Sequence, residues 1–235
     1  TLDKAFSHYL KDRSFDSVVV LDLANFKFNR AKDLAFDRID LNWRNMTKLN
    51  LSNCNLSDED GSKIGSNKTW RNLHELNLSK NQISDKSANA LGDNKAWAEL
   101  KTLNLENNQI SDLAGVKIGS NRSWTKLEEL NLSNNKIGDK TILAITSNKK
   151  LRNLKKLNLS VNQIGPEGGI VLGKNELWTG LEELDLSNNK LGKKRATPIG
   201  DNSSWNNLTA LSLRNNNIGD EGAEYLSKNS RWTHL

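Results

Sequence analysis

Few residues in this 235-residue sequence have the types and spacing that catalysis or metal binding requires. Residues 168–174 match the G-x-x-x-x-G-K core of a phosphate-binding loop, but Asn175 stands where a Ser or Thr would hold the metal ion. The histidines match neither a metal-ligand spacing nor a Ser–His–Asp arrangement. They are His8, His74 and His234. The sequence therefore predicts a protein that is not an enzyme and that has no cofactor, no metal site and no small-molecule substrate.

Composition narrows the class of protein further. Only 35% of the residues are hydrophobic, whereas a globular domain has about 45–50%, so a single thick core is not expected. No apolar stretch reaches the roughly 18 residues that a membrane-spanning helix needs. The seven tryptophans are more apolar bulk than a disordered chain carries. The single cysteine, Cys54, has no disulfide partner within the chain, which favours the reducing cytoplasm.

A period of 27 residues organises the chain. Leucine recurs at this interval, and Met46 extends the series upstream. The positions are Leu73, Leu100, Leu127, Leu154, Leu181, Leu208 and Leu235. Each position opens the pattern L-x-x-L-x-L-x-x-N/C-x-L, in which Cys54 replaces the asparagine of the first regular copy. Alternating leucines such as Leu76 and Leu78 predict a short strand with one buried face. The asparagines, which occupy one column of successive repeats, can bond the neighbouring coil's backbone, so we expect an asparagine ladder.

The second half of each repeat predicts a helix of about two turns. Ser57 followed by Asp58 is typical of a helix N-cap and first helical residue, and most repeats share this chemistry. A recurring glycine is expected to end the helix. It is found at Gly65, Gly92, Gly119, Gly173 and Gly200. Pro198 should shorten the helix that contains it, because proline removes an intrahelical hydrogen bond.

Two further columns predict scaffold rather than chemistry. All seven tryptophans share one column with Leu151, so that column needs apolar volume and predicts a buried spine. A second asparagine column is expected to cap helix C-terminal carbonyls or the returning loop. It contains Asn67, Asn94, Asn121, Asn148, Asn175, Asn202 and Asn229. Much of the asparagine content is therefore architectural.

The repeated pattern resembles the leucine-rich repeat family and covers residues 18–235, as one irregular copy and seven regular copies. The resemblance implies an α/β fold, a leucine-rich repeat solenoid or horseshoe. A concave parallel β-sheet would carry short helices on its convex side. Motifs such as residues 217–223 resemble the ribonuclease-inhibitor-like class, which includes the sensor regions of NOD-like receptors and Ran GTPase-activating proteins. Members of that class are mostly intracellular.

The two ends depart from the repeat. Residues 1–17 are out of register and have the apolar spacing of an amphipathic helix, which we expect to cap the first coil. The chain stops at Leu235, the first residue of another regular repeat, without a polar cap. We therefore expect the chain to be a fragment of a longer protein.

The predicted function is binding of a protein partner on the concave face. Four positions per repeat, such as Glu129, Asn131, Ser133 and Asn134, are expected to face that side. The candidate contact residues are charged side chains and departures from an Asn/Ser background. They are Glu75, Lys80, Glu106, Glu129, Lys156, Val161, Glu183, Asp185 and Arg214. Acidic and basic residues are mixed, so the concave face is not expected to bind nucleic acid.

Two alternatives remain open. Basic residues cluster outside the concave columns, where they would bind an acidic partner or nucleic acid. These are Lys149, Lys150, Arg152 and Lys155, and then Lys190, Lys193, Lys194 and Arg195. The second alternative is the regulatory part of a larger protein that acts on a GTPase or in a ubiquitin pathway, such as a bacterial effector delivered into a host cell.

Overall fold

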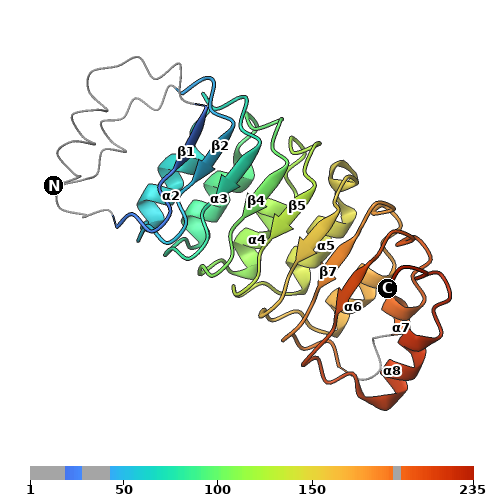
Figure 1. The fold of residues 1–235 in the computed structure, drawn as a ribbon. Helices are drawn as coiled ribbons and strands as arrows, with labels where there is room; N and C mark the ends of the chain where they lie inside the picture. The colour runs from blue at the N-terminus through green and yellow to red at the C-terminus, as the bar shows by residue number, and fades with distance from the viewer. Residues whose placement is uncertain (1–18, 28–42, 193–196) are drawn as a thin grey trace.

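The computed structural model describes residues 19–27, 43–192 and 197–235. Within these residues, eight short strands form one parallel sheet in sequence order (Figure 1). They are β1 (Val20–Asp22), β2 (Lys48–Asn50), β3 (Glu75–Asn77), β4 (Thr102–Asn104), β5 (Glu129–Asn131), β6 (Lys156–Asn158), β7 (Glu183–Asp185) and β8 (Ala210–Ser212). From β2 to β8, each residue pairs with the residue 27 positions later, as Leu76 pairs with Leu103. The predicted period is therefore the strand register.

Short helices lie behind the sheet and run alongside one another (Figure 1). They are α2 (Asp58–Gly65), α3 (Asp85–Asp93), α4 (Asp112–Gly119), α5 (Asp139–Ser147), α6 (Pro166–Gly173), α7 (Thr197–Gly200) and α8 (Gly219–Ser227), with a 3-10 turn η3 at Lys149–Leu151. The predicted solenoid of strands and two-turn helices is confirmed. The predicted capping helix in residues 1–17, and Lys193, Lys194 and Arg195, lie outside the described residues.

The core fills the space between the sheet and the helices. Every strand from β2 to β7 buries its central leucine. The predicted tryptophan spine is confirmed for Leu151 and for the six indoles from Trp43 to Trp205, which are all buried, whereas Trp232 is only partly buried. Trp43 stacks on Trp70 with ring centroids 6.1 Å apart, and Trp70 stacks on Trp97 at 6.3 Å. The apolar residues are therefore buried coil by coil, in agreement with the low hydrophobic content.

Both predicted asparagine ladders are present. The Asn108 amide donates to the carbonyls of Leu78 and Leu105, and its Oδ1 accepts from the backbone N–H of Ile83. In the second ladder, Nδ2 of Asn148 donates to the carbonyl of Gly119, the last residue of α4 in the preceding repeat. These contacts satisfy backbone groups that the short strands and helices leave unpaired.

Cys54 takes the asparagine's place in the first ladder, as predicted. Its thiol donates to the carbonyl of Leu23, with Sγ and oxygen 3.0 Å apart. Burial raises the pKa of the Cys54 thiol to about 11. The side chain is therefore a neutral, buried structural donor and is not available as a thiolate nucleophile at neutral pH.

An aspartate ladder joins successive helices, and the sequence predicted only half of its role. Asp112 begins α4, but its carboxylate accepts hydrogen bonds from the backbone of Gly138 and Thr141 in the next repeat, at 3.0 and 2.8 Å. Asp58, Asp85 and Asp139 reach forward in the same way. Each carboxylate thus caps the following helix N-terminus, where a negative charge is stabilising.

Burial and hydrogen bonding have opposite effects on these carboxyl groups. Burial alone would raise the pKa of Asp112, but hydrogen bonds from Thr141 and Gly138 outweigh it and hold the pKa below its usual value. The pKa of Asp58 is lowered for the same reason, by Ser84 and Ser87 against the effect of burial. Both groups therefore stay ionised in mild acid, and the ladder depends on that charge.

The glycines at the helix ends have a different role from the one predicted. They do lie at or beside the last helical residue, but they adopt no left-handed conformation. A Cβ on Gly65 would lie 2.6 Å from the backbone nitrogen of Leu91 in the neighbouring helix. Glycine is therefore needed for close packing of adjacent helices. The predicted shortening at Pro198 stays a prediction, because residues 193–196, directly before α7, lie outside the described residues.

Candidate protein-binding face

The concave face is built from columns of side chains that the strands place next to one another. The first residue of each strand projects from the sheet, and the register sets Lys156 directly between Glu129 and Glu183. Lys156 forms an ion pair with Glu183 at 2.7 Å, and Lys48 forms one with Glu75 at 2.6 Å. The Glu183 carboxylate raises the pKa of the Lys156 ammonium by accepting its hydrogen bond. These pairs are half-exposed, so they contribute little stability and shape the surface charge instead.

The third residue of each strand supports the turn that follows. Oδ1 of Asn131 accepts the backbone N–H of Ser133 at 3.0 Å, and the same contact recurs from β2 to β7. Among strands β2 to β7, Asp185 is the one residue of this column that is not asparagine, and its Oδ1 accepts the backbone N–H of Ser187 at 2.8 Å. Asp185 therefore keeps the structural contact of the asparagines while adding a negative charge to the concave face.

The expectation that four side chains per repeat face the concave side is wrong for one of the four columns. Ser133 is only 5% exposed, and Ser79, Ser160 and Ser187 are likewise buried. The hydroxyl groups of Ser133 and Ser160 donate to Oδ1 of the asparagine two residues earlier, Asn131 and Asn158. In this column Glu106 is half-buried and Arg214 is exposed. These two residues therefore remain candidates, whereas most of the column is scaffold.

The last of the four columns has a left-handed backbone, which the sequence pattern did not reveal. Its φ angles lie between 52° and 57° from Asn53 to Asn215. Asparagine is the non-glycine residue that tolerates this conformation best. Two asparagines also bond along the column, because Asn134 donates to Asn107 at 3.0 Å. The abundance of asparagine here reflects backbone conformation.

Val161 is the outlier of this column. Its φ is 54°, and a β-branched residue with positive φ is a strained one. Its side chain is 45% exposed and lies between the positions of Asn134 and Asn188, so it also interrupts the asparagine contacts. Lys80 shares the conformation with φ 57° and is exposed, but its unbranched side chain adds less strain. A strained residue that exposes apolar surface needs an explanation beyond the fold.

The structure gathers three of the predicted residues at one hollow. A depression of about 530 Å³ lies over β6, β7 and β8, and its lining includes Lys156, Glu183 and Asp185. The small Ala210 stands in the column of Lys156 and Glu183, and it also lines the hollow. Val161 and Arg214 follow β6 and β8.

The remaining candidates are spread along the sheet. Glu75 and Lys80 lie at β3, Glu106 follows β4, and Glu129 lies on β5. The nine predicted residues are therefore not one site.

Neither a metal centre nor a membrane span emerges from the described part of the chain. No group of three or more His, Cys, Asp or Glu side chains in it is arranged to hold a metal ion. None of its helices is long and apolar enough to cross a bilayer.

Sequence models of leucine-rich repeats match most of the chain. One matches residues 44–65, 71–92, 150–173 and 206–227, a two-copy model matches 98–145, and a third matches 180–202. The chain belongs to the leucine-rich repeat family. Proteins built from this repeat generally serve as protein-interaction modules. The ribonuclease-inhibitor-like class stays a prediction.

Solved structures support the same fold. The internalin InlF of Listeria monocytogenes is 26% identical, with a TM-score of 0.58 over 90% of this chain, which spans 59% of that internalin's length. Internalin C2 of the same organism is 22% identical, with a TM-score of 0.62 over 92% of this chain and 79% of the internalin. The functional domain of InlJ, which includes a cysteine ladder, is 19% identical with a TM-score of 0.56, over 88% of this chain and 37% of that one. No curated protein matches the sequence.

Proposed function

We propose that this leucine-rich repeat protein binds a protein partner on the concave face over β6, β7 and β8. The observation that carries the proposal is the hollow that Lys156, Glu183 and Asp185 line together, with the exposed Val161 in the turn after β6. On the other half of the concave face, the charged departures Lys80 and Glu106 lie apart from each other, in the turns after β3 and β4.

The hollow combines the features of a specific protein contact. Lys156 and Glu183 hold each other in place, so they present a fixed charge pattern that a complementary partner would recognise. Val161 offers an exposed aliphatic side chain three residues after Asn158 of the lining, and its backbone strain costs stability that a binding role would justify. Arg214 is exposed one column away, and arginine is enriched among the residues that dominate binding energy.

The charge of the concave columns favours a protein over a nucleic acid. Acidic and basic side chains alternate across neighbouring strands, as in the order Glu129, Lys156 and Glu183. A phosphate backbone needs a continuous basic stripe, and a carboxylate on each side of Lys156 would repel it. A protein surface can match such alternation residue by residue.

A charge exchange tests the proposal without breaking the ion pair. In the variant Lys156→Glu with Glu183→Lys, the same two charges face each other in reverse order. The exchange also sets a second carboxylate beside Glu129, so thermal melting is used to show that the variant is folded. The matched control is Lys48→Glu with Glu75→Lys, which exchanges the other ion pair of the concave face. Proteins retained from a cell extract by the wild type should be retained by the control and lost by the Lys156–Glu183 exchange. Retention of the same proteins by both exchanged variants would refute a site at β6 to β8.

Two expectations from the sequence stay predictions. The first is a cytoplasmic location, which rests on Cys54 and on the resemblance to the ribonuclease-inhibitor-like class. A role in regulating a GTPase or a ubiquitin pathway would depend on parts of a larger protein.

A further inference from the structure

The convex face breaks the repeat pattern at α4 and α5. The second helical position carries Leu113 in α4, and this side chain is 74% exposed. The other regular repeats carry a charged residue at this position. They have Glu59, Lys86, Lys140, Glu167, Lys194 and Glu221. Because the repeats otherwise place charge at this solvent-facing position, Leu113 is a local exception that the scaffold does not require.

A second column carries aliphatic residues on the same helices. Val116 lies one turn after Leu113 on the same face of α4, and Leu143 occupies the equivalent position of α5 with 53% exposure. Ser62, Asn89 and Glu224 occupy this column in α2, α3 and α8, and Ile170, which is half-buried, occupies it in α6. Together Leu113, Val116 and Leu143 form an apolar patch across two adjacent helices, and exposed apolar patches mark interaction sites.

The patch borders a groove of about 760 Å³ between α4 and α5. Its described lining residues include Val116 and Leu143 and four basic side chains, and none is acidic. The basic residues are Arg122, Lys140, Lys149 and Lys150. A groove of this size is in the range that accommodates ligand side chains.

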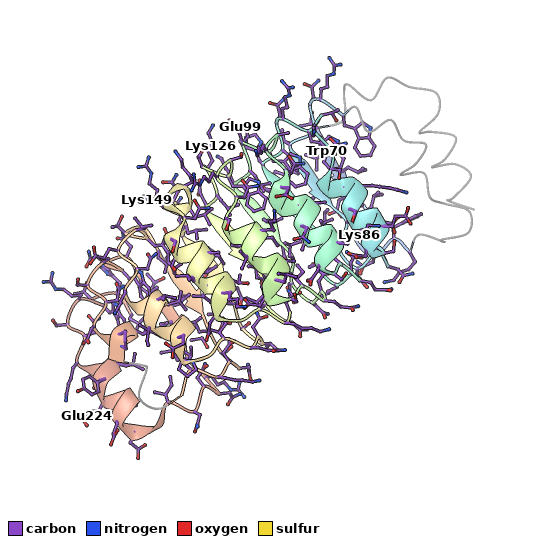
Figure 2. All side chains as sticks on the ribbon, turned by 180° about the vertical axis from the view of Figure 1, so that it is seen from behind. Trp70, Lys86, Glu99, Lys126, Lys149 and Glu224 are labelled. Carbon is purple, nitrogen blue, oxygen red and sulfur yellow. The ribbon has the colours of Figure 1, made fainter. Side chains whose placement is uncertain are left out.

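The basic side chains of the groove differ in their ion pairing from other lysines of the protein. On neighbouring coils, Lys126 pairs with Glu99 at 2.5 Å and Lys155 pairs with Glu128 at 2.7 Å. Figure 2, which views the helical side, shows Glu99 beside Lys126 and Lys149 farther along the same edge. Among the described residues, no ion pair involves any of the four basic side chains of the groove. Their positive charge is therefore uncompensated.

Helix dipoles explain only part of this charge. Arg122 and Lys149 follow helix C-termini, where a cation is favourable, and Lys68 and Lys95 share their column. Lys140, in contrast, lies in the first turn of α5, where a cation opposes the dipole. Its presence beside the apolar patch is not accounted for by the stability of its helix.

We propose that the groove between α4 and α5 binds an acidic, amphipathic segment of a partner protein. Apolar side chains of the segment would cover Leu113, Val116 and Leu143, and its carboxylates would pair with the basic side chains around the groove. A nucleic acid would engage the positive charge but would leave the aliphatic patch exposed, so the combination favours a peptide. This surface lies on the helical side, away from the concave face, and the two sites are independent.

Selection from a library of short random peptides tests the proposal directly. Peptides selected on the immobilised protein should combine Asp or Glu with Leu, Phe or Trp. The first variant is Leu113→Lys with Leu143→Ser, which introduces residues that the same columns already use in Lys86 and Ser62. It adds one positive charge and removes two of the three side chains of the patch, so any loss of binding is not caused by a loss of positive charge. A selected peptide should bind it at least about tenfold more weakly, because burial of one leucine contributes about 1.5–3 kcal/mol.

A charge variant and its control complete the test. Lys149→Glu uses the residue that Glu176 provides in the same column, and it should weaken binding of the selected peptide. Lys68→Glu changes the same column three repeats away and should leave binding unchanged. Three results would overturn the proposal. The selected peptides could lack enrichment in acidic and apolar residues, or a selected peptide could bind the Leu113→Lys with Leu143→Ser variant as tightly as the wild type. The third result is binding of a single-stranded oligonucleotide that Lys149→Glu abolishes and the Leu113→Lys with Leu143→Ser variant leaves intact. Thermal melting of each variant confirms that it is folded.

Discussion

Replacement of Val161 by asparagine should make the protein more stable. Val161 has a φ of 54°, close to the 52° of Asn134 and the 56° of Asn188 in the same column. The left-handed conformation costs an ordinary residue about 1–2 kcal/mol, and asparagine tolerates it. The new amide would also lie between two asparagines, in a column where Asn134 already donates to Asn107 at 3.0 Å. Little apolar burial is lost, because Val161 is 45% exposed.

The expected gain in unfolding free energy is therefore about 1–2 kcal/mol. For a chain of this size it corresponds to a rise in Tm of about 2–8 °C, measured by calorimetry and by urea unfolding. The reciprocal variant, Asn134→Val, should lower stability by a similar amount, since it introduces the same strain. An unchanged or lower Tm for Val161→Asn, together with a neutral Asn134→Val, would refute the strain at Val161. If Val161 contacts the partner, the stabilised variant should also bind it more weakly.

Three further outcomes follow from the scaffold. Asp112→Asn should cost about 1–3 kcal/mol in urea unfolding at pH 7. Because the folded pKa of Asp112 is lowered, this difference should begin to shrink near the unfolded pKa of about 4 and disappear as the pH falls through the lower folded pKa; a difference that does not shrink in acid would contradict the ladder. Gly65→Ala places a Cβ 2.6 Å from Leu91 and should destabilise by about 1–3 kcal/mol, whereas Gly180→Ala, with no atom within 4 Å, should leave Tm unchanged. Cys54, whose pKa is about 11, should react with a maleimide only as the protein unfolds, and rapid labelling at pH 8 would show that its burial is wrong.

Most of the fold could be predicted because repetition makes each position visible several times. The leucine interval predicts the strand register, and a tryptophan column that also accepts Leu151 predicts a buried position. Both asparagine ladders could be predicted as well, since an invariant polar column beside a buried strand must satisfy backbone groups. Even Cys54 could be interpreted from its column.

Contacts between columns could not be predicted, because the sequence pattern gives neither the direction of a side chain nor the backbone φ angle of its residue. Asp112 was expected to act on its own helix, but its carboxylate reaches Thr141 of the next repeat. A column of asparagines looks the same whether it lies in a strand or at a positive φ, so the strain at Val161 was invisible. The groove between α4 and α5 joins residues of two repeats, and only the structure shows that Leu143 and Lys149 line one surface.

The sequence named the residues of the candidate site but did not show which of them lie together. Lys156, Glu183 and Asp185 were among nine candidates spread along the sheet, and their convergence depends on the small Ala210 beside them. Ala210 was not a candidate, because the candidates were chosen for their charge or for their departure from an Asn/Ser background. In the folded sheet, the small side chain of Ala210 leaves space that a side chain of a partner would fill.

Photo-crosslinking from the hollow is the most direct test of the proposed binding face. A photoreactive amino acid is placed at Ala210, which lines the hollow, and at Thr102, which occupies the same strand position on β4. Irradiation in a cell extract should give a discrete covalent adduct from position 210 and none from position 102. An equal adduct from both positions, or an adduct from position 102 alone, would contradict a binding face over β6, β7 and β8.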